Sequence, residues 1–180
     1  MKKVIIILIS LIAIQNLQSQ TKATVVKKIQ FKIDILTPGL SLENGIGDYS
    51  TIYSELGTSL GAHKASNSNK PKFLISPYIK SQYRYYYNFE KRQNKGKNTF
   101  KNSGNFIAFS TSYYFKPISN SIYLSTYDGI TLAPVWGLQR TYNSGLNINF
   151  NTGLGYTISS NKSNGIVPII NFTIGWVIGK

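Results

Sequence analysis

The chain contains one histidine, and it is the first residue to consider for catalysis. His63 lies beside a polar stretch that contains Ser66, and a histidine near a serine could act as a general base for a nucleophile. That chemistry also requires a carboxylate to orient the imidazole ring, and no carboxylate lies near His63 in the sequence. We therefore interpret His63 as an exposed loop residue, and we predict no catalytic residue, no metal site and no cofactor.

Charged residues at alternating positions form a second candidate site. They lie on the polar side of predicted strands, and they are Lys32, Asp34, Glu43, Glu55, Lys80 and Arg84. Such a set could act as a selectivity ring or as a catalytic carboxylate pair. It could equally be an ion-pair network that fills a narrow interior, because buried charges need partners and an eight-stranded barrel is just wide enough for side chains. We favour the ion-pair network and predict that these six residues form a polar cluster in a lumen.

The strands that position this cluster are recognised by their period of two. In residues 145–158, apolar side chains from Leu146 to Ile158 alternate with asparagine, glycine and threonine, which indicates an extended strand rather than a helix. The same alternation predicts further strands, and the full set lies near residues 28–36, 39–46, 50–62, 73–88, 107–115, 130–139, 145–158 and 170–178. The sequence therefore predicts an all-β chain of eight strands.

The count of eight depends on the interpretation of residues 28–46. The apolar positions are odd-numbered up to Ile35 and even-numbered from Leu40, and the change falls at Pro38-Gly39. A change of phase at a Pro-Gly pair indicates either a tight turn between two strands or a bulge in one long strand. We interpret it as a turn, because a single strand would give seven, and an odd count cannot bring both ends of the chain to the same side of a barrel.

The composition limits the kind of protein. Only 14 % of the residues are charged, against about 25 % in an average soluble domain, while 13 % are aromatic. The formal net charge of +14 would normally suggest a nucleic-acid partner. The absence of cysteine excludes disulfides, thiolate metal sites and a lipoprotein anchor.

The first twenty residues resemble a secretory signal peptide. Two lysines precede an apolar run from Val4 to Ile14, and a short polar segment ends at Ser19 and Gln20. Eleven apolar residues are too few for a membrane-spanning helix, which takes about 20. We therefore predict a signal peptide at residues 1–20 and one domain at residues 21–180. An exported chain meets anionic lipid and polysaccharide rather than nucleic acid, so we expect no nucleic-acid partner.

Taken together, these patterns resemble the small outer-membrane β-barrel proteins of Gram-negative bacteria, including those with an uncharacterised outer-membrane barrel domain. The likeness rests on the signal peptide and on strand segments spread over most of the mature chain, namely PGLSLE, RYYYNFEKR, WGLQR, GLGY and residues 172–176. It implies an eight-stranded antiparallel up-and-down transmembrane β-barrel in the cell outer membrane. It further implies contact with outer-membrane lipid and lipopolysaccharide, insertion by the barrel-assembly machinery, and a monomer.

Two functions remain open from the sequence. The first is a non-enzymatic integral outer-membrane protein, structural or surface-interacting, whose lumen is filled by side chains. The second is a secreted soluble β-barrel that binds a small apolar ligand, in which case the apolar face of each strand would point inward. The basic run Lys91, Arg92, Lys95, Lys97 and Lys101, flanked by Phe89 and Phe100, could bind nucleic acid, but we expect a solvated connection at the periplasmic rim.

Overall fold

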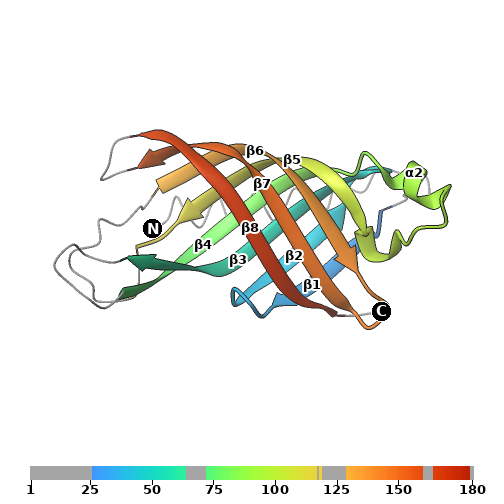
Figure 1. Cartoon of the computed structure of the whole chain (residues 1–180), viewed down its shortest axis with the longest axis horizontal. Helices are drawn as coiled ribbons and strands as arrows, with labels where there is room; N and C mark the ends of the chain where they lie inside the picture. Colours follow the sequence, from blue (N-terminus) through green and yellow to red (C-terminus); the bar gives the residue numbers. More distant parts are fainter. Residues whose placement is uncertain (1–25, 64–71, 117, 119–128, 160–163, 179–180) are drawn as a thin grey trace.

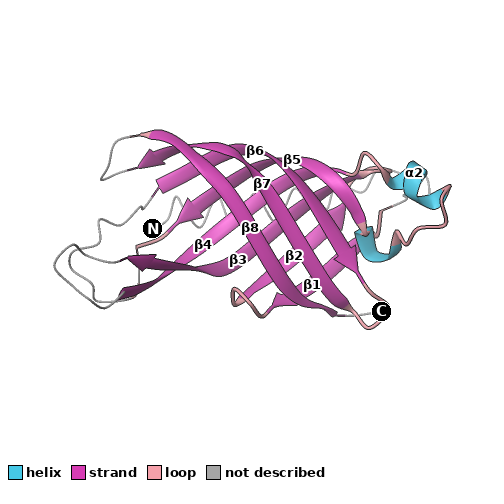
Figure 2. Ribbon diagram, viewed as in Figure 1, coloured by secondary structure: helices cyan, strands magenta, loops and turns pink. Residues whose placement is uncertain are grey.

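The chain forms a closed barrel of eight antiparallel strands in sequence order (Figures 1 and 2). In this computed structural model the described residues are 26–63, 72–116, 118, 129–159 and 164–178, so the predicted signal peptide lies outside them. The strands are β1 (Ile29–Asp34), β2 (Gly39–Gly45), β3 (Ser50–His63), β4 (Lys72–Tyr85), β5 (Gly104–Tyr114), β6 (Gly129–Thr141), β7 (Leu146–Ser159) and β8 (Gly165–Ile178). The predicted all-β fold and its eight strands are confirmed.

The turn at Pro38 is a hairpin, which settles the question left open by the phase change. β1 pairs with β2, with Ile29 opposite Asn44 at one end and Asp34 opposite Gly39 at the turn. β1 also pairs with β8, which closes the ring. Both ends of the barrel-forming chain, at Ile29 and Ile178, therefore lie at one rim of the barrel, which we call the terminal rim. The opposite rim, where β3 ends and β4 begins, is the distal rim.

Most polar side chains of the described strands point inward, and most large apolar side chains point outward. In β1, Gln30, Lys32 and Asp34 are buried, whereas Ile29, Phe31 and Ile33 are exposed. The alternation of buried and exposed residues continues in β5 and β6, although a small apolar cluster lies among the inward residues there, formed by Phe106, Ala108, Ala133 and Val135. The interior of the described barrel is therefore mainly polar, and its outer wall is apolar.

The hairpin β1–β2 is shorter than the wall that it completes. β1 has 6 residues and β2 has 7, whereas β3 and β8 have 14 each. Ile35 donates its backbone N–H to Ile174, so even-numbered residues of β8 direct their backbone groups toward β1. Between Ile174 and the distal rim, residues 166–172 of this edge have no strand partner among the described residues. Pro168 lies on this free edge and supplies no N–H, which discourages pairing with another strand.

The long connection between β4 and β5 closes the terminal rim. It contains the helices α2 (Phe89–Gln93) and η2 (Phe100–Asn102), and α2 projects beyond the barrel (Figure 1). We expected a solvated connection, but Phe89 is fully buried, and Asn102 accepts the backbone N–H of Lys27 at 2.7 Å. The burial of Phe89 could not be predicted from the sequence, because a single phenylalanine among lysines gives no periodic signal. No helix in the described part of the chain is long and apolar enough to cross a membrane.

β8 begins earlier than its alternation predicts. Residues 166–170 are apolar on both faces of the strand, so the period of two that identifies a strand is lost there. Pairing with β7 nevertheless extends to Gly165, opposite Thr157. The wall therefore reaches the distal rim at full height on this side.

The seam between β1 and β8 depends on a residue without a side chain. Gly175 lies opposite Asp34, and a Cβ at Gly175 would clash with the carbonyl oxygen of Ile33 and lie 2.9 Å from the Cα of Asp34. We expect Gly175→Ala to destabilise the barrel by about 1 to 3 kcal/mol, the usual cost of forcing an extra methyl into a packed site. Unfolding in urea, followed by intrinsic fluorescence, measures this change.

Gly165→Ala is the matched control in the same strand, because no atom lies within 4 Å of the added Cβ. Its stability should equal or slightly exceed that of the wild type. Equal stability of the two variants would show that the seam does not need the glycine.

Candidate functional site

The polar cluster predicted from the sequence lies inside the barrel. All of its six residues are buried, and they account for every buried charged residue of the described chain: Lys32, Asp34, Glu43, Glu55, Lys80 and Arg84. Three are cations and three are anions, so the lumen charges balance within the barrel. The structure divides them into two groups, one around Glu43 near the terminal rim and one around Glu55 nearer the middle.

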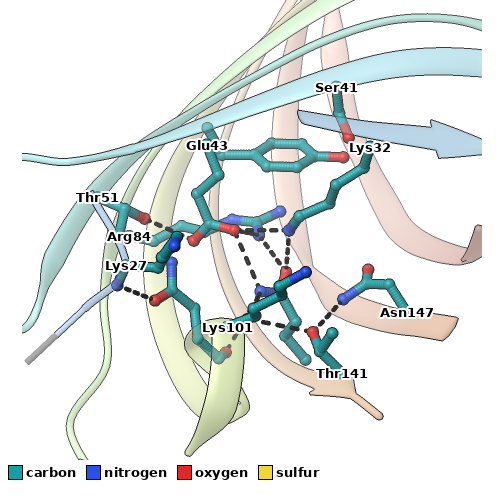
Figure 3. Close-up of polar contacts among 12 residues, drawn as sticks. Lys27, Lys32, Ser41, Glu43, Thr51, Arg84, Lys101, Thr141 and Asn147 are labelled. Carbon is teal, nitrogen blue, oxygen red and sulfur yellow. Dashed lines mark hydrogen bonds and ion pairs between the residues drawn. The ribbon is translucent and has the colours of Figure 1, made fainter. Parts of the chain in front are cut away.

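Glu43 is the centre of the first group (Figure 3). Its Oε2 lies 2.6 Å from Lys32 Nζ and 3.9 Å from a terminal nitrogen of Arg84. Its Oε1 accepts hydrogen bonds from Thr51 at 2.9 Å and from Tyr86 at 2.6 Å. The carboxylate is 0 % exposed, so these donors replace the water that it would otherwise require.

Gln139 links this carboxylate to the opposite wall of the barrel. Its Nε2 donates to Glu43 at 3.1 Å, and its Oε1 accepts from Lys32 at 2.8 Å and from Arg84 at 3.2 Å. The network thus joins side chains from β1, β2, β3, β4 and β6 across the lumen. Such a link fixes the strands relative to one another in addition to the backbone pairing.

Aromatic rings enclose the Arg84 guanidinium. The Cζ atom of Arg84 lies 3.6 Å from the centroid of the Tyr53 ring and 4.4 Å from that of Phe106. A guanidinium placed between two rings gains cation–π attraction in a site from which water is excluded. Tyr86 stacks on Phe89 at a centroid distance of 4.7 Å and contacts Phe106. This aromatic layer blocks the lumen at the terminal rim.

Tyr86 lies just beyond β4, and its hydroxyl remains a hydrogen-bond donor. Burial, followed by the negative charge of Glu43, raises the pKa of the Tyr86 hydroxyl well above its ordinary value. The hydroxyl therefore stays protonated over the physiological pH range and can donate its hydrogen bond to Glu43 throughout that range.

Glu55 is the centre of the second group. Lys80 Nζ lies 3.0 Å from it, and the hydroxyls of Tyr53 and Tyr78 both donate to it, the former at 2.9 Å. Asp34 accepts a hydrogen bond from Ser41 at 3.3 Å. Among the described residues Asp34 forms no ion pair, in contrast to Glu43 and Glu55, although it faces the same interior.

The remaining candidates from the sequence do not join this cluster. His63 is the last residue of β3, and Ser66 lies outside the described residues, so a His–Ser pair has no structural description. Within the described ranges, no group of three or more histidine, aspartate or glutamate residues is arranged to hold a metal. The side chains that sequence reasoning left out of the cluster are Thr51, Gln82, Tyr86 and Gln139, which share the inward phase of their strands.

Comparison of the chain with protein-family models, curated proteins and solved structures found no match. The arguments about function therefore rest on the residues and the geometry described above.

The Glu43 network predicts a large effect of removing its central anion. Glu43→Gln should destabilise the barrel by about 3 to 5 kcal/mol, because Lys32 and Arg84 would remain buried without a compensating charge. Chemical denaturation in the same lipid or detergent as the wild type measures the loss. Glu90→Gln is the control, since Glu90 is exposed and accepts one hydrogen bond, from Tyr49. A loss for Glu43→Gln as small as that of the control would contradict the prediction.

Proposed function

We propose that this chain is an integral outer-membrane β-barrel protein with a non-enzymatic, structural or surface-interacting role. The observation that carries the proposal is the distribution of side chains, with an apolar wall facing outward around the ring and the charges facing inward. In water such a wall would be unfavourable, because soluble monomers rarely expose contiguous apolar patches beyond about 300 to 600 Å². In a bilayer it is the surface that lipid requires.

The exposed side chains support a membrane environment in detail. Aliphatic and phenylalanine side chains occupy the central part of the wall, such as Leu56 at 56 % exposure, Phe109 at 54 % and Leu154 at 64 %. Aromatic residues gather at the terminal rim, among them Tyr85, Tyr87, Tyr142 and Trp176. Tyrosine and tryptophan are typical of the lipid–water interface, because their rings are apolar and their polar atoms prefer water.

The strand lengths also support the proposal. A membrane-spanning β-strand needs about 9 to 11 residues, and β3 to β8 have 11 to 14 residues each. With both ends of the barrel at the terminal rim, that rim would face the periplasm, as in bacterial barrels with an even strand number. The distal rim would then face the outside of the cell.

The alternative, a secreted barrel with an apolar interior, receives less support. Its ligand cavity would require a mainly apolar lumen. The described lumen instead holds three carboxylates, three cations and many amides and hydroxyls, and its apolar side chains, among them Phe106 and Val135, pack in one cluster. Nucleic-acid binding by the basic connection is also disfavoured, since the burial of Phe89 leaves it unavailable to stack on a base. We further propose a monomer that contacts outer-membrane lipid and lipopolysaccharide and is inserted by the barrel-assembly machinery.

The proposal predicts where the protein resides and how its wall responds to charge. The mature chain should sediment with outer membranes and resist carbonate extraction.

Phe109→Arg should lower barrel stability in bilayers by about 2 to 4 kcal/mol, the cost of a cation near the bilayer midplane, whereas Phe109→Leu should cost much less. Recovery of wild-type protein as a folded monomer in detergent-free buffer would contradict the membrane assignment.

A second prediction concerns conduction. Arg84, Tyr53, Phe106 and Glu43 fill the lumen near the terminal rim and are each at most 2 % exposed. An eight-stranded barrel filled in this way leaves no continuous water path, so the purified protein should give no stable single-channel steps in planar bilayers. Large and regular conductance steps would show that the cluster opens.

A further inference from the structure

An apolar groove runs along the outer wall of the barrel over β4 to β7. Its volume is about 600 Å³, within the range of about 300 to 1,000 Å³ that is usual for small-molecule sites. Its lining includes the rings of Tyr85, Phe109 and Trp136 on β4, β5 and β6, and the smaller residues Thr152 and Gly153 on β7, which we call the floor. A larger residue cannot replace Gly153 without strain, because a Cβ there would clash with the carbonyl oxygen of Pro134.

Two arginines lie just beyond the end of this groove at the terminal rim. Arg140 follows Trp136 by two outward positions on β6, and its guanidinium donates to the carbonyl of Gly104 at 2.9 Å and to the side chain of Asn105 at 2.6 Å. Asn105 itself is the outward residue next to Ile107, which lines the groove. The arginine head is therefore held beside Asn105, one outward position from the groove lining, and we call this place the mouth of the groove.

Arg92 from α2 adds a second positive charge at this mouth. It donates two hydrogen bonds to the carbonyl of Asn98, at 3.2 and 2.7 Å, and Asn98 is fixed by a hydrogen bond to Thr141. Through Asn98, Arg92 is thus linked to the residue that follows Arg140 in β6. Neither arginine forms an ion pair with a carboxylate of the described residues. Two held cations without an anion are complementary to a phosphate, which guanidinium groups bind through paired N–H donors.

The groove and its mouth together have the shape of an amphiphile. Arg140 follows Trp136 by four residue steps, which span about 13 Å of strand. One amphiphile can therefore place its charged head at the arginines and a hydrocarbon chain in the groove. Trp136 Nε1 donates to the hydroxyl of Tyr87 at 2.8 Å, which places an aromatic pair of the interfacial type between the two parts.

We propose that this groove binds one anionic glycerophospholipid, with its phosphate at Arg92 and Arg140 and one acyl chain between Tyr85, Phe109 and Trp136. The inference rests on the proposed membrane location and names a specific lipid partner for it. The bound lipid would lie in the leaflet on the side of the terminal rim. It would differ from the lipids around the rest of the wall because it would remain bound even when anionic lipid is a small fraction of the bilayer.

The two tryptophans of the chain provide the measurement. Trp136 lines the groove, whereas Trp176 is exposed on β8 outside it. Trp176→Phe leaves Trp136 as the reporter, and Trp136→Phe leaves Trp176. Each is reconstituted in phosphatidylcholine bilayers that contain increasing fractions of phosphatidylglycerol with brominated acyl chains, and the quenching of fluorescence is followed.

We expect Trp136 to reach half-maximal quenching at a roughly tenfold lower fraction of the brominated lipid than Trp176, given the attraction of two interfacial arginines. Arg92→Gln with Arg140→Gln in the Trp136 reporter should remove this difference. Lys95→Gln with Lys97→Gln is the matched control. Both lysines are exposed on the same connection, and this variant loses the same charge as the double arginine variant. Thr152→Phe, which fills the groove floor, should remove the difference without altering the arginines.

Equal quenching of Trp136 and Trp176 in an inserted barrel would overturn the lipid site. The site would also be overturned if brominated phosphatidylcholine quenched Trp136 as effectively as brominated phosphatidylglycerol. The same conclusion would follow if the arginine variant and the lysine variant lost the preferential quenching equally. Insertion is scored independently by resistance of the vesicle-bound protein to carbonate. A chain that remains soluble would overturn the membrane proposal and the site together, whereas an inserted chain without a preference would overturn the site alone.

Discussion

The structure depends on the need of every buried backbone N–H and C=O for a partner. A sheet loses its unpaired edges only where its first and last strands join, and here β1 joins β8 over a short segment, with Phe31 opposite Ile178 at one end and Asp34 opposite Gly175 at the other. The seam is narrow because the first hairpin is short, and it requires the close approach that Gly175 permits. Above it, the free edge of β8 carries Pro168, whose missing N–H discourages other strands from pairing there.

Closure with eight strands leaves an interior that side chains nearly fill, and this determines how the charges are arranged. A carboxylate such as Glu43 cannot reach water, so it is stabilised only by donors on other strands. Lys32, Thr51, Tyr86 and Gln139 provide them. Because these donors come from different sides of the ring, the network that neutralises the charge also holds the barrel together at the terminal rim.

The outer wall follows different rules from the interior. Its apolar side chains need not interlock with one another, and a groove can persist where small residues such as Thr152 and Gly153 lie beside the large rings of neighbouring strands. Among the residues whose side chains the structure describes, the excess of cations over anions lies outside the lumen, since the buried cations and anions are equal in number. Part of that excess, at Arg92 and Arg140, lies where the apolar wall ends.

The sequence by itself determined most of the strands and which residues of each strand share a face, including the shared polar phase of the six charged residues. A period of two is a local property, so the phase that contains Lys32 or Glu55 can be assigned without knowing its neighbours. Prediction from the period of two failed in β8, where both faces are apolar. It also failed in the β4–β5 connection, where the burial of Phe89 has no periodic signal. Only the tertiary structure decided which side of the wall faces inward and that Gln139, more than 90 residues after Glu43, completes its network. Those relations depend on strand register and ring closure, which join residues far apart in the chain and leave no local pattern in the sequence.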